Sequence, residues 1–128
     1  MTAFAAITLD DAASAAAVFS PSTIDPNGVA KLFENVSGQV FDSRRAISLG
    51  VKLPKNGGNV ARVTAKVVVP VMDPNDSSIK IGEVIANCEF VLPKTATDTQ
   101  RADALAFMAN FLADASVVAA VGSLESIY

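Results

Sequence analysis

The sequence predicts an α+β fold, with β-strands first along the chain and α-helices last. Two observations support this order. Apolar and polar residues alternate in three runs up to Leu92, as in strands with one buried face. Beyond Leu92 the apolar spacing changes to three and four residues, which is typical of a helix. At 128 residues the chain is long enough for one domain and too short for two, so we expect a single domain over residues 1–128.

The first part of the chain predicts a β-hairpin followed by a loop. Two short apolar runs, Ala3 to Leu9 and Ala15 to Phe19, flank a stretch that contains Asp10-Asp11, although the alanine-rich second run would also suit a helix. Ser20 to Gly28 holds two prolines and an Asn-Gly pair, so we expect a loop there. Val29 to Phe33 fits either a short strand or a turn of helix.

The middle of the chain predicts an antiparallel hairpin with one buried face and one solvent-facing side. Residues 46–52 and 62–69 both alternate between apolar and polar side chains. Pro54 to Asn59, between them, is rich in glycine and asparagine, which accept positive φ in turns. Pro70 lacks a backbone donor and is expected to end the second strand.

A third alternating run, Val84 to Leu92, follows a polar loop at Met72 to Ser78. Its even-numbered side chains, which include Cys88, are apolar and belong to the buried face. A small buried thiol is the ordinary interpretation of Cys88. The odd-numbered side chains, including Asn87 and Glu89, face the other way.

Two helices are predicted at the end of the chain. Thr97 is followed three residues later by Gln100, the signature of a capping box at a helix start. Apolar residues between Leu105 and Leu112 fall on two adjoining stripes, so this helix should be covered on more than one side. Asp114 to Ser116 interrupts the pattern, and a short second helix is expected to end near Gly122.

The hydrophobic content indicates that part of the chain is covered by a membrane or by another subunit. Hydrophobic residues make up 51% of the sequence, and a chain of this size has too little interior to bury them all. No window reaches the ~18 apolar residues that a membrane-spanning helix needs. Residues 1–16 carry Asp10 and Asp11 and no basic residue, unlike a secretory signal. We therefore expect that the chain does not insert into a membrane. We expect instead a symmetric homodimer, in which each subunit's helices pack over the partner's sheet.

The residue types exclude several kinds of chemistry. The chain has one cysteine and no histidine, which rules out an intramolecular disulfide, a Cys/His zinc site, and serine–histidine or cysteine–histidine catalysis. An enzyme could still use carboxylates or lysine, but no strand face carries a close carboxylate pair. We expect no enzyme activity, no cofactor and no metal site.

Charge is strongly segregated along the chain. The net charge is −3, yet the segment from Arg44 to Lys66 holds six basic residues and no acidic one. The other 105 residues hold four basic and thirteen acidic residues. A local positive field attracts phosphate whatever the total charge, so this segment predicts nucleic-acid binding. The alternative interpretation is an ordinary solvated strand face.

Five stretches of the chain have a recognisable order and spacing, although no single one is specific. These are Asn-Gly-Val-Ala at Asn27 to Ala30, Ser43 to Leu49 (SRRAISL), Arg62 to Pro70 (RVTAKVVVP), Asn87 to Pro93 (NCEFVLP), and Thr97 to Tyr128 with its Ile-Tyr ending. Taken together, they make the whole chain resemble the coat proteins of single-stranded RNA bacteriophages, the levivirus-like family.

The resemblance implies a fold and a function. The family subunit is an N-terminal hairpin, a five-stranded antiparallel sheet and two helices. Two subunits interlock their helices over one ten-stranded sheet, and the dimers assemble into an icosahedral shell in the bacterial host cytoplasm. The other face of the sheet binds a stem-loop of genomic RNA, which represses translation of the replicase gene and marks the genome for packaging. The implied location is the virion.

Seven residues are predicted to form the RNA-binding face. Six of them match family RNA-contacting positions: Ser48, Arg62, Thr64, Lys66, Asn87 and Glu89. Lys52 joins them as part of the basic cluster on the same face. Lysine and arginine there would neutralise phosphates, and Thr64 and Asn87 would hold base edges or the phosphate register.

Two residues depart from the family pattern. Ile85 stands where members often have a base-stacking tyrosine, and Gly50 where arginine is common. The stem-loop preference is therefore expected to differ from that of relatives. In the loop Met72 to Ile81, Asp73 and Asp76 could bind calcium between subunits, but two solvated carboxylates are the simpler interpretation. The alternative function is a dimeric RNA-binding module without a capsid role, with an enzyme of similar fold as a third hypothesis.

Overall fold

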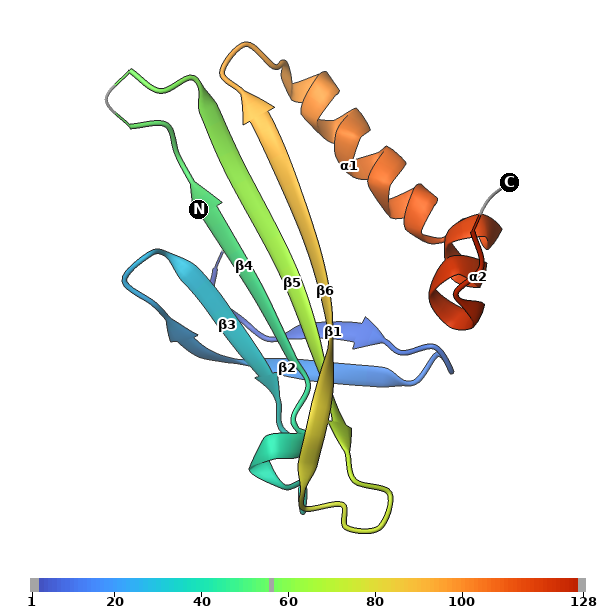
Figure 1. The fold of residues 1–128 in the computed structure, drawn as a ribbon. Helices are drawn as coiled ribbons and strands as arrows, with labels where there is room; N and C mark the ends of the chain where they lie inside the picture. The colour runs from blue at the N-terminus through green and yellow to red at the C-terminus, as the bar shows by residue number, and fades with distance from the viewer. Residues whose placement is uncertain (1–2, 56, 127–128) are drawn as a thin grey trace. The chain divides into compact units, whose positions relative to one another are not determined.

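The computed structural model of the chain describes residues 3–55 and 57–126. They form two compact units, one ending at Val91 and one beginning at Leu92 (Figure 1). Met1, Asn56 of the predicted turn and the Ile127-Tyr128 ending lie outside the described residues. The elements are β1 (Ile7–Asp10), β2 (Ala16–Ile24), β3 (Val29–Glu34), the short 3-10 helix η1 (Phe41–Ser43), β4 (Ala46–Lys52), β5 (Val60–Met72), β6 (Lys80–Pro93), α1 (Asp98–Leu112) and α2 (Ala115–Ser123).

The six strands form one sheet in the order β1-β2-β3-β4-β5-β6, so neighbours in sequence are neighbours in space (Figure 1). The predicted N-terminal hairpin is present, because β1 pairs with β2 from Ile7↔Phe19 to Asp10↔Ala16. Val29 to Phe33, which the sequence left undecided, belongs to strand β3. The observed count is six strands, where a separate hairpin and a five-stranded sheet were expected.

The count differs because β2 serves both the hairpin and the sheet. It pairs with β1 in its first half and with β3 from Phe19↔Glu34 to Ile24↔Ala30. The predicted loop over Ser20 to Gly28 was therefore wrong for Ser20 to Ile24. A register shift between Pro21 and Thr23 marks a β-bulge, which accommodates the proline without ending the strand.

Strand β5 also continues beyond its predicted end at Pro70 and reaches Met72. The pairing of β4 with β5 runs from Lys52↔Arg62 to Ala46↔Val68 and stops there. Pro70 therefore faces no β4 residue that requires its missing backbone N–H, and the strand tolerates it.

The register confirms the predicted division of the sheet into two faces. Four cross-strand pairs of β4 and β5 lie on one side, which we call the polar face: Ser48↔Lys66, Gly50↔Thr64, Lys52↔Arg62 and, at the end of the ladder, the apolar pair Ala46↔Val68. Three apolar pairs lie on the opposite side, which we call the apolar face: Ile47↔Val67, Leu49↔Ala65 and Val51↔Val63. A slip of one residue would exchange these two sets, so the alternation fixes the register.

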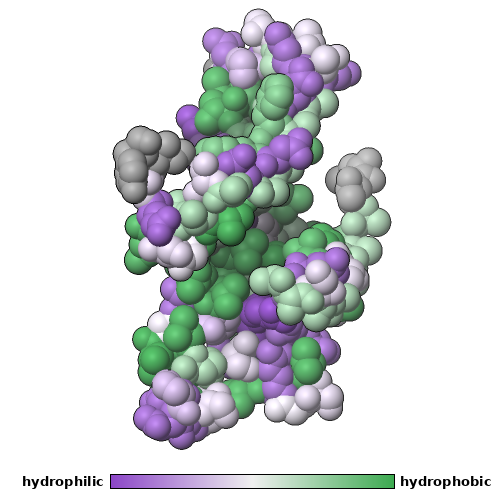
Figure 2. Space-filling model, turned by 90° about the vertical axis from the view of Figure 1, so that its right-hand side faces the viewer, coloured by the Kyte–Doolittle hydropathy of each residue, from purple (hydrophilic) through white to green (hydrophobic). Residues whose placement is uncertain are grey.

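The single chain has almost no hydrophobic core. Phe19 and Leu32 are the only buried apolar side chains in the described part of the chain. On the apolar face Leu49, Val51 and Val84 are about half exposed, at 47%, 50% and 58%. Hydrophobic residues form open surface patches in Figure 2. A chain with this much exposed apolar surface requires a partner to cover it.

The second unit contains the two predicted helices. The capping box is confirmed, since Thr97 Oγ1 accepts a hydrogen bond from the Gln100 backbone N–H and the Gln100 side chain accepts one from Thr97. Asp114 caps the start of α2 by accepting from the Ser116 backbone N–H at 2.9 Å. Neither helix contains a buried residue. No single described helix is long and apolar enough to cross a membrane, while α1 and α2 together, bent by 54°, meet that test by length and composition alone.

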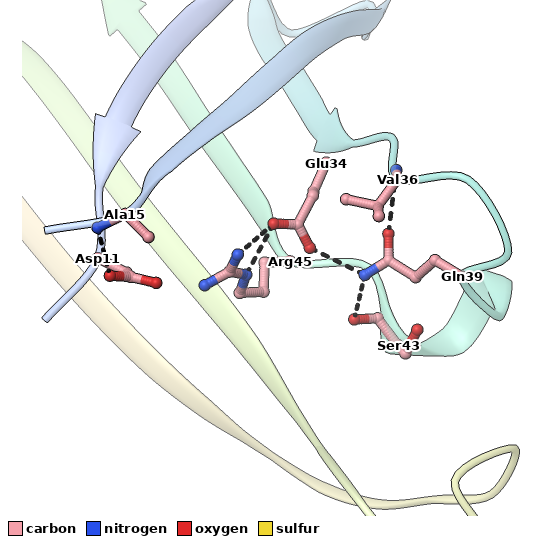
Figure 3. A network of polar contacts seen from close by, with 7 residues as sticks. All are labelled: Asp11, Ala15, Glu34, Val36, Gln39, Ser43 and Arg45. Carbon is pink, nitrogen blue, oxygen red and sulfur yellow. Dashed lines mark hydrogen bonds and ion pairs between the residues drawn. The ribbon is translucent and has the colours of Figure 1, made fainter. Parts of the chain in front are cut away.

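An ion pair between the buried Glu34 and the partly exposed Arg45 holds the segment between β3 and β4 (Figure 3). Glu34 is only 4% exposed, and its Oε2 accepts a hydrogen bond from Arg45 Nε at 3.0 Å and another from Arg45 Nη2. Gln39 Nε2 donates to Glu34 Oε1 at 2.8 Å and to the Ser43 carbonyl at 3.2 Å. The Arg45 guanidinium holds the pKa of Glu34 below its usual value, and Glu34 raises the pKa of Arg45.

Replacing Glu34 is expected to destabilise the protein in a pH-dependent way. Glu34→Gln removes a charged acceptor from Arg45, which should cost about 1.5–3 kcal/mol of unfolding free energy at pH 7. The lowered pKa of Glu34 means that this contribution is complete above the unfolded value near 4.5 and disappears as the pH falls through the folded value. Urea unfolding of both proteins between pH 7 and pH 3 measures the difference.

The matched control is Glu83→Gln, which removes a carboxylate from a pair with Lys80 in which both side chains are more than one third exposed. An exposed pair contributes little, so this variant should unfold close to the wild type. Equal losses for the two variants, or a Glu34→Gln loss independent of pH, would contradict the structural role assigned to Glu34.

Candidate nucleic-acid interface

The polar face carries a row of basic side chains across adjacent strands. Lys31 on β3 is opposite Ser48 on β4, which is opposite Lys66 on β5. Four residues further along these strands, Lys52 and Arg62 are directly opposite each other. Like charges that face each other across a sheet destabilise it slightly, so such a pair suits a surface that binds an anion.

Strand β6 adds the remaining predicted residues to the same face. Arg62 Nη1 donates to Glu89 Oε1 at 2.5 Å, which places Glu89 beside the basic row. Asn87 is exposed and shares the strand face of Glu89 by alternation. Glu83 on the same side pairs with Lys80 at 2.9 Å, and this hydrogen bond lowers the pKa of Glu83, with a smaller effect from Lys66.

All seven predicted site residues therefore share the polar face. Five of them, Ser48, Lys52, Arg62, Thr64 and Lys66, are placed there by the β4–β5 register. Within the described residues, the side chains of Ser48, Lys52, Thr64 and Asn87 form no hydrogen bond or ion pair, so their polar groups are open to a ligand. Five of the seven residues are exposed, and Ser48 and Lys66 are half-buried.

Sequence reasoning missed Lys31 as a member of this face. The residue lies on β3 with its neighbour Phe33 two positions along, and both face the polar side through their partners Ser48 and Ala46. Val29 to Phe33 was not assigned to a strand, so its alternation was not used. The two-residue spacing of Val29, Lys31 and Phe33 is that of one face of a strand, and it could have placed Lys31 on this face.

The loop carboxylates are already engaged in turns. Asp73 Oδ1 accepts from the Asn75 backbone N–H at 2.8 Å. Asp76 Oδ1 accepts from the backbone N–H and the hydroxyl of Ser78, and these bonds lower the pKa of Asp76. No cluster of three or more acidic or cysteine side chains suited to a metal occurs among the described residues. One oxygen of each of the two carboxylates is thus already used by a hydrogen bond within its own turn.

Comparison with known protein families decides the identity. The family model described as Levivirus coat protein matches residues 2–128. The chain belongs to the levivirus coat protein family. Membership of this family makes it a capsid structural protein. No curated protein sequence matches this coat protein.

Solved structures support the fold. The chain is similar to the virus-like particle of Beihai levi-like virus 21, with 22% identity, a TM-score of 0.87 and 99% of each chain covered. It is also similar to the protein capsid of bacteriophage GA, with 16% identity, a TM-score of 0.72 and 98% of each chain covered. A third relative is an unassembled virus coat protein dimer, described as a bacteriophage RNA-binding dimer, with 19% identity, a TM-score of 0.65 and 98% of each chain covered.

The structure shows the surroundings of the two residues that depart from the family pattern, Ile85 and Gly50. Ile85 is 45% exposed, so this coat protein presents an aliphatic side chain on β6 instead of a ring. Gly50 lies opposite Val29, and a Cβ built on Gly50 would approach Val29 Cγ2 to 2.9 Å. The absence of a side chain at Gly50 is thus matched to the branched side chain across the strand pair.

The effects of Gly50→Ala and Val29→Ala on the free energy of unfolding of this coat protein are expected not to be additive. The added methyl meets a β-branched side chain with little rotamer freedom, and overpacking of this kind costs on the order of 1 kcal/mol. The same substitution should cost less in a Val29→Ala background, with a coupling of about 0.5–1.5 kcal/mol. Urea unfolding of the four proteins of this double-mutant cycle measures it, and additive effects would show that the contact is relieved elsewhere.

Proposed function

We propose that this coat protein forms symmetric dimers, that the dimers assemble into a small icosahedral shell, and that the polar face binds stem-loops of the genomic RNA. Binding would package the genome and repress translation of the replicase gene. The observation that carries the RNA part is the basic row on an open face, with Lys52 opposite Arg62 and Lys31 in line with Lys66. The two compact units would act together as one coat protein domain, since the family match spans both.

Two features support the dimer. The apolar face and both helices leave large hydrophobic side chains exposed, and a second copy offers a matching surface. Strand β6 is 14 residues long and lies at the edge of the sheet, with its outer backbone groups open to pairing. Pairing of two β6 edges would join strands β2–β6 of each subunit into ten strands, with the helices interlocked over the apolar face.

The polar face has the chemistry of an RNA surface. Lysine and arginine would release counterions from the phosphates, which makes affinity fall with salt. Thr64 and Asn87, whose side chains have no protein partner among the described residues, could hydrogen bond base edges or sugar hydroxyls. The open form of the face also fits a folded RNA better than a small substrate, which usually occupies an enclosed pocket.

The stem-loop should differ from those of relatives that stack a base on tyrosine. Ile85 offers no aromatic ring, and Gly50 offers no guanidinium. Base stacking on an aromatic contributes about 1–3 kcal/mol, so the loop base that relatives recognise would lose much of its advantage here. The virion would be the final location, after assembly in the host cytoplasm. The alternative function is a dimeric RNA-binding module without a capsid role.

Assembly is expected to depend on the apolar stripe of α1. Wild-type protein expressed in bacteria should form particles visible by electron microscopy that contain RNA, while Leu112→Asp should yield neither particles nor dimers. The introduced charge would have to be buried against the partner, at a cost that a dimer interface does not tolerate. Sedimentation distinguishes particles, dimers and monomers.

The matched control is Asn110→Asp, which introduces the same residue at a polar position in the same turn of the helix and should assemble normally. Soluble wild-type dimers without particles, under several salt conditions and with RNA present, would leave only the RNA-binding module. Normal assembly of a soluble Leu112→Asp protein would contradict the packing of α1 in the dimer.

RNA affinity is expected to depend on Lys66. Lys66→Ala should weaken binding to the stem-loop enriched in RNA from purified particles by about 10-fold, because a charged contact is lost. It should also lower the slope of log affinity against log salt by about 0.7–0.9, the value of one phosphate contact. Filter binding at several salt concentrations measures both quantities.

The control for charge is Lys94→Ala, which removes one lysine from an exposed position outside the sheet. Its affinity and salt slope should match those of the wild type. If Lys66→Ala behaved like Lys94→Ala, the polar face would not be the RNA site.

A further inference from the structure

A hollow of about 310 Å³ lies at one end of the polar face, and we call it the Phe41 basin. Phe41 and Arg44, from the segment around η1, line one side of it. The side chains of the sheet that line it include Lys31, Phe33, Ala46, Ser48 and Lys66. Binding pockets for small ligands span about 300–1,000 Å³, so the basin fits one nucleotide and not a paired stem.

Phe41 presents an open aromatic ring at this place. The residue is 70% exposed, so most of its ring surface is open to solvent. The Arg44 guanidinium carbon lies 5.3 Å from the ring centroid, so a cation already covers part of the ring. This cation–π contact orients the ring and leaves most of its surface open for a second planar group.

Arg44 itself lacks a protein counter-charge. Among the described residues it forms no ion pair, and its Nε is buried without a hydrogen-bond partner. A buried donor without an acceptor is unfavourable, so an acceptor from a ligand would stabilise this side chain. Phosphate oxygens are strong acceptors for a guanidinium.

The charge around the basin favours an anion. Its lining contains four cations and two carboxylates: Lys31, Arg44, Lys66, Lys80, Asp42 and Glu83. Lys80 and Glu83 pair with each other at 2.9 Å, so their charges largely cancel. The remaining three cations face one carboxylate, Asp42, and the basin keeps a positive potential.

The segment that carries Phe41 is held firmly in place. Gln39 Nε2 donates to Glu34 and to the Ser43 carbonyl, on either side of Phe41 in sequence. Glu34 is in turn fixed by Arg45, the neighbour of Arg44 (Figure 3). A ring on an anchored segment is preorganised for stacking, because little entropy is lost when a base binds.

We propose that the Phe41 basin binds one unpaired nucleotide of single-stranded RNA, with the base stacked on Phe41 and the phosphate held by Arg44 and Lys31. The inference rests on the proposed RNA binding by the polar face and adds a contact for a nucleotide outside the paired stem. The ring would thereby supply a stacking platform at a different place from Ile85. Removal of the ring is expected to weaken single-strand binding by about 5- to 100-fold.

A tryptophan reporter tests the stacking directly, since the chain contains no tryptophan of its own. In the Phe41→Trp protein, indole fluorescence should be quenched by a 12-nucleotide adenosine RNA and not by an abasic ribose-phosphate strand of equal length. Leu53→Trp is the matched control, because Leu53 is also 70% exposed and does not line the basin. Equal quenching at both positions, or quenching by the abasic strand, would overturn the proposal.

Two further outcomes would also overturn it. Quenching by adenosine monophosphate as strong as by the RNA, at equal nucleotide concentration, would assign the basin to a free nucleotide. A change in tryptophan emission on particle assembly, without quenching by RNA, would place Phe41 in a contact between subunits.

Affinity measurements separate this inference from the proposed function. Phe41→Leu should weaken binding of the adenosine RNA by about 5- to 100-fold with an unchanged salt slope, while Arg44→Gln should also lower the slope by about 0.7. If Lys66→Ala weakens binding and Phe41→Leu does not, the basin proposal fails and the RNA-binding face stands. If the wild type binds neither this RNA nor the stem-loop from particles, both fail.

Discussion

The uncovered apolar face is the constraint on which the rest of this structure depends. Half of the residues are hydrophobic, yet only Phe19 and Leu32 are buried apolar side chains in the described part of the chain. Each 100 Å² of apolar surface removed from water contributes about 2.5 kcal/mol, so covering this face is the main stabilisation that the chain can still gain. If a second copy covers this face, the stability of the folded protein is expected to depend on protein concentration.

Because one face is committed to a partner, the other face is left to carry the polar function. The alternation of β4 and β5 keeps the two roles separate from Ile47↔Val67 to Lys52↔Arg62, where apolar pairs alternate with polar or glycine pairs; the terminal pair Ala46↔Val68 is apolar although it lies on the polar face. The segregation of charge follows the same division. The basic segment from Arg44 to Lys66 includes β4 and much of β5, whereas the rest of the sequence is acidic. An acidic protein can thus present a basic face.

Much of this arrangement could be predicted from the sequence, and the failures have physical causes. Alternation in residues 46–52 and 62–69 gave the two faces and the register, and Thr97 with Gln100 gave the start of α1, because these signals are local. Pro21 and Pro70 led to wrong predictions of where strands end. A β-bulge accommodates Pro21, and the pairing with β4 stops before Pro70, so neither missing backbone N–H is needed there. Phe41 and Arg44 could not be placed on the polar face from pattern. Their position depends on part-buried side-chain contacts that Gln39 and Arg45 make with Glu34, and strand alternation does not predict such contacts.

The polar face is not uniformly basic, and this shapes how RNA would lie on it. The cations Lys31, Lys52 and Lys66 belong to β3, β4 and β5, while β6 contributes Glu83 and Glu89. In the proposed dimer the two β6 strands adjoin, so the acidic residues gather at the centre and the cations lie on either side. Phosphates would then be attracted to the outer strands and disfavoured at the centre. The central strip, where Asn87 and Ile85 are exposed, suits bases and sugars better than backbone charge, so the RNA strands would run along the flanks with their bases turned inward.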